Sequence, residues 1–353
     1  MTPTEAFNAF LASLGQSNSA PSNTTNADTL GVVTGVVSDA QSTINAQLIN
    51  DYLASKDCAV FDWRDDLIHV GETIRLGRNG NGLVGISAAP VFGPATSGAR
   101  AFFTGTAGGY VLLACPTSNT EDLCSPSIVG VSVLGNDLAD HGVGFQGCYL
   151  PRGDRLHVWG IKPVNGSFGF VFSHNPDHTG SAVNCCYGGT FGSLTAHVVG
   201  GANGFLFTGK ANSSGTNTCF STFQYCHATM VNGDAFYCQK GDDNNFMQIG
   251  VSRGAGGTGR GLVMAADPAT TLHWVGNVIH NMNLSKTDGA NLKITLHGTG
   301  IRGNRITYNG VDYRPDIELT GGAVMNANQF DFLGQSNYNN GWVAGGNPSM
   351  SVW

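Results

Sequence analysis

The sequence predicts an all-β protein, a right-handed single-stranded parallel β-helix (solenoid) with short N-terminal α-helical segments. The first observation is a repeated unit in which an asparagine stands two places before an apolar residue or cysteine. Its steps vary from 24 residues (Asn304 to Asn328) to 33 residues (Asn184 to Asn217). The second is a column of short apolar segments in phase with these units. The third is that apolar residues recur at every second position, which is typical of strands. The irregular length of the repeat indicates a solenoid whose loops vary in length.

Two in-phase columns indicate at least two strands in each coil. The asparagine units are Asn184-Cys185-Cys186, Asn217-Thr218-Cys219, Asn245-Phe246-Met247, Asn277-Val278-Ile279, Asn304-Arg305-Ile306 and Asn328-Gln329-Phe330. The apolar segments are Phe170-Val171-Phe172, Phe205-Leu206-Phe207, Phe236-Tyr237-Cys238, Leu262-Val263-Met264, Leu292-Lys293-Ile294 and Ile317-Glu318-Leu319.

Equivalent side chains in stacked coils lie about 4.8 Å apart, so both columns are expected to become internal stacks. Phe170, Phe205 and Phe236 are expected to form one stack. The second stack is expected to contain Cys186, Cys219, Met247, Ile279, Ile306 and Phe330. The asparagines are expected to form a ladder at a bend, each amide bonding its neighbour and the turn backbone. The alternative is that they are scattered loop residues.

Composition limits the class of protein. The chain has 51 glycines in 353 residues and 41% hydrophobic residues, which indicates a turn-rich folded protein. Only 12% of the residues are charged and the net charge is −7, so no basic stripe suits nucleic acid or an anionic membrane. No stretch approaches the roughly 18 apolar residues of a membrane span, and the first residues lack the features of a secretory signal. Secretion, if it occurs, is expected by another route such as cell lysis.

The nine cysteines are an odd number, and most occupy inward-facing places in the repeat. They are expected to pack as small apolar groups, with few or no disulfides. No Cys-x-x-Cys or histidine spacing accompanies Cys185, Cys186, Cys219, Cys226 or Cys238. No metal site and no cofactor are therefore predicted.

Three regions are predicted: an N-terminal helical attachment or capping region at 1–57, the parallel β-helix at 58–335, and a non-repeating tail at 336–353. Helices are predicted at 4–14 and 39–54, where apolar residues recur at helical spacing. The second helix is expected to cover the first coil. Strands are expected at residues 60–63, 67–70, 73–76, 83–86, 101–103, 110–113 and 128–133.

The helix before Ala59, the strand at 73–76 that runs into 80–85, and the asparagine units together resemble the pectate-lyase-like right-handed parallel β-helix superfamily. The resemblance covers about residues 58–335. Within that superfamily, the helical tail, the polar surface of low charge and the short carboxyl end are most similar to bacteriophage tailspike proteins. The similarity is one of pattern, and the superfamily's lyase motifs are not matched.

The resemblance implies a homotrimer, in the virion or outside the cell, that binds a bacterial surface polysaccharide (capsule or O-antigen) and often depolymerises it. It also implies attachment to a phage tail or baseplate protein through residues 1–57. No nucleic-acid partner and no membrane insertion are expected. The alternatives are a bacterial polysaccharide lyase or adhesin with this fold, and a virion structural protein without enzymatic activity. Among depolymerases, a glycoside hydrolase is favoured over a lyase.

Glycoside hydrolysis usually needs two carboxylates about 5 to 10 Å apart, a range that adjacent coils provide. The chain has four glutamates, so loop aspartates are the main candidates. The candidate catalytic residues are Asp234, Asp242, Asp243 and Asp267. The alternative for Asp242 and Asp243 is turn chemistry, because they stand in a Gly-Asp-Asp-Asn segment.

A lyase would instead need a base, with a cation to neutralise a uronate. The candidate set for that chemistry is Arg152, Arg155, His157, His174 and His178. Aromatic faces pack on sugar rings, which gives the candidate carbohydrate-binding residues. These are Tyr237, Trp274 and Tyr308, and the alternative for each is a place in the core or in a subunit contact. Val171, Leu206 and Val263 are expected to face outward as an apolar stripe, which favours burial between subunits.

Overall fold

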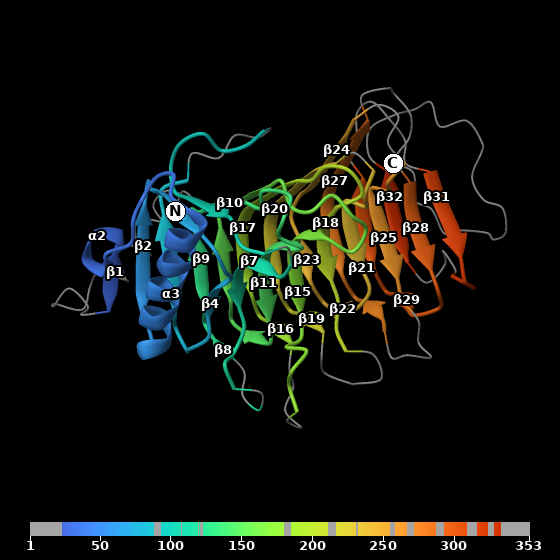
Figure 1. Cartoon of the computed structure of the whole chain (residues 1–353). Helices are drawn as coiled ribbons and strands as arrows, with labels where there is room; N and C mark the ends of the chain where they lie inside the picture. The colour runs from blue at the N-terminus through green and yellow to red at the C-terminus, as the bar shows by residue number, and fades with distance from the viewer. Residues whose placement is uncertain are drawn as a thin grey trace, which may run out of the picture.

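The computed structural model describes residues 23–87, 93–106, 108–118, 120, 123–179, 185–210, 217–230, 232–254, 258–266, 272–286, 293–308, 316–323 and 328–332. These residues form an elongated parallel β-helix, which confirms the predicted fold class (Figure 1). Their strands belong to a sixteen-stranded sheet (sheet A), a nine-stranded sheet (sheet B) and a seven-stranded sheet (sheet C).

One coil visits all three sheets. From residue 190 the chain forms β17 (Thr190–His197) in sheet A, β18 (Asn203–Phe207) in sheet B and β19 (Thr218–Cys219) in sheet C. The next strand, β20 (Thr222–Met230), returns to sheet A and pairs in parallel with β17. The third strand of the coil has only 2 residues, and the sequence analysis, which predicted at least two strands in each coil, placed its residues in the asparagine column.

The remaining strands follow the same order. Sheet A also contains β1 (Thr24–Asn26), β2 (Val60–Arg64), β3 (Leu67–Val70), β5 (Gly82–Gly85), β6 (Arg100–Phe103), β9 (Ser127–Val129), β10 (Ser132–Leu134), β13 (Arg152–Asp154), β14 (Leu156–Trp159), β23 (Asn245–Phe246), β24 (Ile249–Arg253), β27 (Val278–Lys286), β30 (Arg305–Tyr308) and β32 (Gln329–Phe332). Sheet B also contains β4 (Ile74–Leu76), β7 (Tyr110–Ala114), β11 (His141–Gln146), β15 (Phe168–Ser173), β21 (Phe236–Cys238), β25 (Leu262–Ala265), β28 (Lys293–His297) and β31 (Asp316–Thr320). Sheet C also contains β8 (Leu123–Cys124), β12 (Cys148–Tyr149), β16 (Cys186–Tyr187), β22 (Gly241–Asp242), β26 (Trp274–Val275) and β29 (Ile301–Arg302).

A helix closes the first coil. The short helix α2 (Ala27–Leu30) precedes α3 (Asp39–Ser55), which packs on β3 and β4 at the N-terminal end of the coil stack (Figure 1). Ile49 and Leu53 of α3 are fully buried. The helix predicted at 39–54 is therefore confirmed, while the helix predicted at 4–14 and the tail at 336–353 lie outside the described residues.

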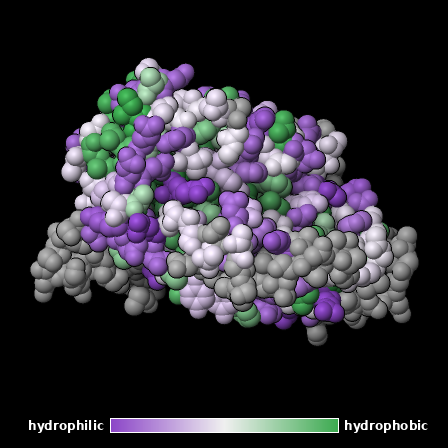
Figure 2. All heavy atoms as spheres, turned by 60° about the horizontal axis from the view of Figure 1, so that its bottom comes forward, coloured by the Kyte–Doolittle hydropathy of each residue, from purple (hydrophilic) through white to green (hydrophobic). Residues whose placement is uncertain are grey.

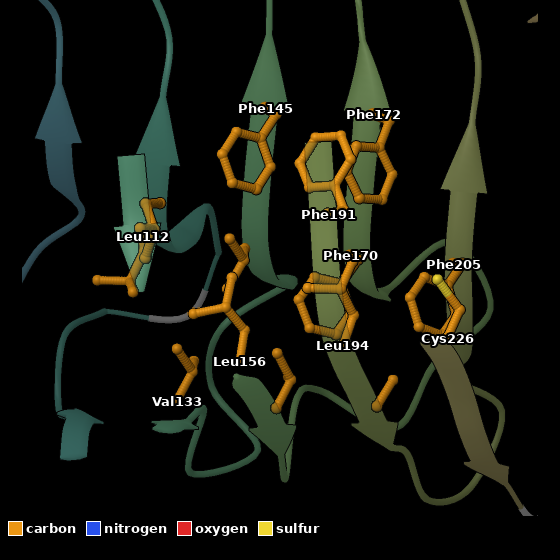
Figure 3. Close-up of a cluster of buried hydrophobic side chains, with 14 of the residues drawn as sticks. Leu112, Val133, Phe145, Leu156, Phe170, Phe172, Phe191, Leu194, Phe205 and Cys226 are labelled. Carbon is orange, nitrogen blue, oxygen red and sulfur yellow. The ribbon is translucent and has the colours of Figure 1, made fainter. Parts of the chain in front are cut away.

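The first predicted stack is confirmed. Phe170, Phe205 and Phe236 are register partners in sheet B, and their rings stack at centroid distances of 5.0 and 4.6 Å. Val143 and Leu262 extend the column in both directions. Figure 3 shows Phe170 and Phe205 among the side chains that fill the interior of the coils. The apolar period of two identified the inner face of this sheet.

The second predicted stack is confirmed in part. Ile279, Ile306 and Phe330 are register partners in sheet A. Phe246 and Phe223 continue this column in the N-terminal direction. The column therefore runs along the inner face of sheet A and meets the sheet B column inside the coils.

Three members of the predicted second stack are wrong. Cys186 and Cys219 lie in the third strand of their coils, in sheet C, and Met247 is 45% exposed. The inward residue of this segment is Phe246, which stands two places after Asn244. The predicted unit, which ran from Asn245 to Met247, is therefore shifted by one residue. A one-residue shift turns a strand side chain to the opposite face.

A ladder of buried asparagines follows sheet C at its corner with sheet A. Its members are Asn244, Asn277, Asn304 and Asn328. Nδ2 of Asn277 donates to Oδ1 of Asn304 at 3.1 Å and to the Gly241 carbonyl at 3.0 Å. Nδ2 of Asn304 donates to Oδ1 of Asn328 at 2.8 Å. These amides satisfy turn backbone groups that would otherwise be buried without partners.

The ladder uses different asparagines from some of those predicted. Asn217 stands before β19 and donates to Asp242, so it belongs to another corner. Asn245 is half-buried in β23 beside Val278, one place after the ladder position. Asn184 lies outside the described residues.

The outward apolar stripe predicted on sheet B is also corrected. Val171 and Val263 are 2% and 1% exposed within a single chain. Leu206 lies beside Val171 in register, and Tyr237 lies beside Val263. Each valine has a longer side chain on one side, about 4.8 Å away, which covers part of its surface. These valines therefore give no support to a subunit interface.

None of the nine cysteines, all of which lie in the described part of the chain, forms a disulfide, and seven of them are buried. Neither helix in the described part of the chain is long and apolar enough to cross a membrane.

Candidate functional site

The predicted catalytic aspartates do not form one group. Asp234 lies before β21 and Asp242 lies after it, so the strand separates them. The Asp234 carboxylate binds Arg260, with Nη2 to Oδ2 at 2.7 Å and Nε to Oδ1 at 3.0 Å. This bidentate pair joins adjacent coils and gives Asp234 a structural role. Asp267 lies outside the described residues.

Asp242 is the second residue of β22 and lies half-buried on the outer face of sheet C. Nε2 of His273 is 3.2 Å from both of its carboxylate oxygens, and the Asn217 amide donates to Oδ2. Burial raises the pKa of Asp242, and the charge of His273 opposes that shift. A carboxyl group that is held by two neighbours, has a raised pKa and remains 28% exposed fits a general acid.

A buried lysine lies next to this carboxyl group along the chain. Lys240 is 0% exposed, and its Nζ donates to the Lys210 carbonyl at 3.0 Å. Burial lowers the pKa of Lys240, and the negative charge of Asp242 opposes this shift. Burial, followed by the positive charges of Lys210, Lys240 and His178, lowers the pKa of His174 to about 4. Buried lysines are rare, and clusters of perturbed groups concentrate at functional sites.

Asp243 has a different environment from Asp242. It is exposed and has a left-handed φ of 52°. Its backbone N–H donates to the Val275 carbonyl of the next coil at 3.0 Å. The turn role considered from the sequence therefore describes the backbone of Asp243, while its carboxylate faces solvent beside Asp242.

Two of the three predicted carbohydrate-binding aromatics are wrong. Trp274 and Tyr308 are each 1% exposed and face the interior of the coils. The centroid of the Trp274 ring is 5.8 Å from that of Phe207, so its face packs on core side chains. Tyr237 is half-buried on the outer face of sheet B, and its part in sugar binding stays a prediction.

A row of exposed and half-buried aromatic side chains follows sheet C instead. This aromatic stripe consists of Tyr149, Tyr187 and Phe220. Tyr149 and Tyr187 are register partners with stacked rings 5.1 Å apart, and the Phe220 ring lies 5.4 Å from Tyr187 with a tilt of 53°. Tyr149 and Phe220 are 43% and 55% exposed. Sheet C lies along the bottom of Figure 1, and Figure 2 turns this side forward to show a mostly polar surface with small apolar groups.

The backbone beside the stripe is strained. Leu150 and Phe220 have left-handed φ angles of 53° at the corner where glycine occupies the same place in other coils, as at Gly188. The Leu150 N–H donates to the Tyr187 carbonyl at 2.7 Å, and the Phe220 N–H donates to the Asp242 carbonyl at 3.1 Å. Large side chains in this conformation are costly, and such positions cluster at functional sites. The last bond also places the end of the stripe next to Asp242.

A groove on the outer face of sheet A borders the stripe. Its volume is about 610 Å³, and Leu150 lines it together with the apolar side chains of Val84 and Val129. Arg152 and Arg155 are also among its lining residues. A mostly apolar concavity with a few polar groups is the usual form of a ligand site.

The residues of the alternative lyase set do not come together. Arg152 and Arg155 lie at the groove, whereas His174 and His178 follow β15 at the corner near Lys240. His157 is 0% exposed in β14. None of the three histidines of this set lines the groove with the two arginines.

The sequence contained a signal for the stripe. A cysteine directly precedes each of its aromatic residues, as in Cys148-Tyr149, Cys186-Tyr187 and Cys219-Phe220. In the first two pairs the cysteine faces inward in sheet C and the aromatic residue faces outward. A search for repeated cysteine-aromatic pairs would have found these residues. The burial of Lys240, in contrast, depends on the loop of another coil that contains Lys210.

His157 makes the stability of the fold dependent on pH. Neither ring nitrogen has a hydrogen-bond partner among the described residues, and burial, followed by the charge of His197, lowers its pKa from 6.5 to about 4. Below pH 6.5 the unfolded chain binds a proton that the folded chain excludes, so stability falls as the pH falls towards 4. We expect a loss of about 3 kcal/mol over this window from His157.

Urea unfolding at pH values on both sides of 6.5 measures this loss. His157→Leu is expected to reduce the pH dependence, whereas His280→Leu, at an exposed position, is expected to leave it unchanged. Equal pH dependence in the wild type and His157→Leu would contradict this assignment.

Comparisons with known proteins identify a shared fold. No protein-family model and no curated protein sequence matches the chain. Among solved structures, the chain is similar to ORF18 of Geobacillus virus E2, with a TM-score of 0.51 and 12% identity over 93% of this chain and 65% of that one. This chain thus spans about two thirds of the length of that viral protein, and the likeness is one of fold alone.

Two enzymes align with lower TM-scores. The C387A mutant of DFA-IIIase from Arthrobacter chlorophenolicus A6 has a TM-score of 0.37 and 10% identity, over 83% of this chain and 86% of that one. An alginate lyase from Paenibacillus sp. str. FPU-7 has a TM-score of 0.36 and 11% identity, over 78% of this chain and 96% of that one. Scores this low carry no functional assignment, so the function of this chain has to be argued from its own surface residues.

Proposed function

We propose that the protein binds a bacterial surface polysaccharide, capsule or O-antigen, along the outer face of sheet C, in the manner of a phage tailspike. The aromatic stripe carries this proposal, because Tyr149 and Tyr187 stack in register on a rigid scaffold and the exposed Phe220 ring extends the row. Coils repeat about every 4.8 Å, so the stripe offers equivalent contacts to a ligand that is itself a repeating chain.

The chemistry of the stripe suits sugars. The hydroxyl groups of Tyr149 and Tyr187 have no hydrogen-bond partner among the described residues, so they are available to sugar hydroxyls. Phe220 is tilted away from Tyr187 and leaves part of its ring face exposed. Aromatic side chains of this kind combine a large apolar surface with, in tyrosine, a polar group.

Asp242 is the proposed general acid for cutting the bound chain. Hydrolysis breaks the bond between the anomeric carbon and the glycosidic oxygen, and that oxygen takes the proton of Asp242. A water molecule bonds to the anomeric carbon and gives its proton to a base, for which the neighbouring exposed Asp243 is the candidate. The Phe220 N–H bond to the Asp242 carbonyl keeps this acid at the end of the stripe.

Attachment to a phage tail or baseplate protein through residues 1–57, a homotrimeric state and a place in the virion are part of the same proposal. Val33, Val36 and Ile44 are 44%, 85% and 47% exposed in this region. Figure 2 shows an apolar group at the N-terminal end of the molecule. Exposed apolar groups of this kind support attachment to another protein chain.

A panel of purified capsule and O-antigen polysaccharides tests the proposal. We expect the wild type to bind at least one of them, and Tyr187→Ala to bind it about thirtyfold less tightly, as for the loss of a contact worth about 2 kcal/mol. Tyr237→Ala, the same change on sheet B, is the matched control and is expected to bind like the wild type. The proposal would be contradicted if Tyr237→Ala abolished binding and Tyr187→Ala left it intact, because the ligand would then lie on sheet B.

A further inference from the structure

We infer that the groove on sheet A recognises a carboxylate of the bound chain, so that the ligand is an acidic polysaccharide containing uronate or another carboxylated sugar. This inference rests on the proposed function, because it assigns a second contact region to the same ligand. Arg152 and Arg155 carry it, since both line the groove at its border with the aromatic stripe.

The groove and the stripe are continuous. Leu150 follows Tyr149 directly in the chain and lines the groove, as does Gly188, which follows Tyr187. Arg152 begins β13 two residues later, where it pairs in register with strands on either side. A single oligosaccharide can therefore contact the tyrosines and the arginines together.

The groove has a negatively charged side chain towards one end and positively charged side chains towards the other. Asp62 lines it on β2, and Arg152 lines it on β13, three strands away along sheet A in the order β2-β5-β9-β13. At about 4.8 Å per strand, the two charges lie on the order of 14 Å apart. The basic end is the one beside the stripe, so an anionic group of a ligand on the stripe meets the arginines first.

The arginine end of the groove is open to solvent. Nε of Arg155 lies 3.5 Å from Asp154, but the Arg155 side chain remains 41% exposed. Asp154 also accepts a hydrogen bond from the Ser193 N–H at 2.9 Å, so its charge is shared with the backbone. Arg152 is exposed and adds a second guanidinium to this end.

The chemistry of these groups selects carboxylates. A guanidinium is planar, stays charged and can hold both oxygens of a carboxylate. The apolar walls formed by Val84, Val129 and Leu150 lower the local dielectric, which strengthens such a pair. The whole chain carries a net charge of −7 and repels a polyanion, so a local basic site is needed to bind one.

The test compares the tightest-binding polysaccharide of the panel with the same polymer after its carboxylates are reduced to alcohols. We expect the wild type to bind the native polymer about ten- to hundredfold more tightly than the reduced one, as for a hydrogen bond to a charged group. Arg152→Gln should lose that factor for the native polymer and bind the reduced polymer like the wild type. Arg75→Gln, at an exposed arginine of β4 in sheet B and so on another face of the coils, is the matched control and should bind both like the wild type.

The outcomes separate the two proposals. A neutral polysaccharide as the tightest ligand, or equal affinity for the native and reduced polymers, overturns the inference and leaves the proposed function standing. An equal loss for both polymers in Arg152→Gln would show a structural effect of the substitution and also overturns the inference. If no polysaccharide of the panel binds, the proposed function itself is contradicted, and the inference that rests on it is overturned with it.

Discussion

Phe223→Ala is expected to lower the free energy of unfolding by about 3 to 5 kcal/mol. Phe223 is 0% exposed and stacks between Phe191 and Phe246, at centroid distances of 4.7 Å on each side. The rings of Phe172 and Phe207 meet it edge-on at 5.1 and 5.3 Å. Strands of the coils above and below hold all four neighbours, so the cavity left by the missing ring cannot collapse.

Urea or thermal unfolding of the purified variant measures this effect. Val164→Ala removes apolar surface at a position that is 44% exposed, and is expected to change stability by less than about 0.5 kcal/mol. A Phe223→Ala variant as stable as the wild type would contradict the stacked interior described here.

Asp242→Asn is expected to slow cleavage of the bound polysaccharide by about a hundredfold or more, because general acid catalysis contributes that much to such reactions. Asparagine keeps the size of the side chain and can still bond to His273, but it has no proton of suitable acidity for the glycosidic oxygen. Binding to the stripe is expected to persist. The release of new reducing ends measures the rate, and the panel assay measures binding.

Asp234→Asn is the matched control for this variant. It breaks the ion pair with Arg260, so it is expected to lower stability while leaving the cleavage rate of the folded protein unchanged. Cleavage by Asp242→Asn at the wild-type rate would remove Asp242 from the mechanism. A wild type that binds polysaccharide without releasing reducing ends would reduce the protein to a binding function.

The interior of the coils could be predicted from the sequence because strand periodicity determines which side chains face inward. Phe170, Phe205 and Phe236 stand at equivalent places in segments of alternating pattern, and any parallel stacking of those segments brings them together. Ile279 and Ile306 were found in the same way. Three members of the corner ladder, Asn277, Asn304 and Asn328, were predicted from the sequence. The fourth, Asn244, was missed because the predicted unit began one residue later, at Asn245.

The surface could not be predicted to the same extent. Sheet C strands have 2 residues each, as in β16 and β26, which is too short for a period to appear. The first residue of these strands faces inward and the second outward, which buries Trp274 and leaves Tyr187 half-buried on the outer face. Aromatic residue type alone did not distinguish these two positions. The ion pair of Asp234 and the burial of Lys240 likewise depend on loops that meet only after the coils have stacked.

A crystal structure with an oligosaccharide of the bound polysaccharide soaked in tests the central claim most directly. The account predicts sugar density across Tyr149, Tyr187 and Phe220, with an end that reaches Asp242. Density on sheet B over Tyr237, with the outer face of sheet C left empty, would contradict it.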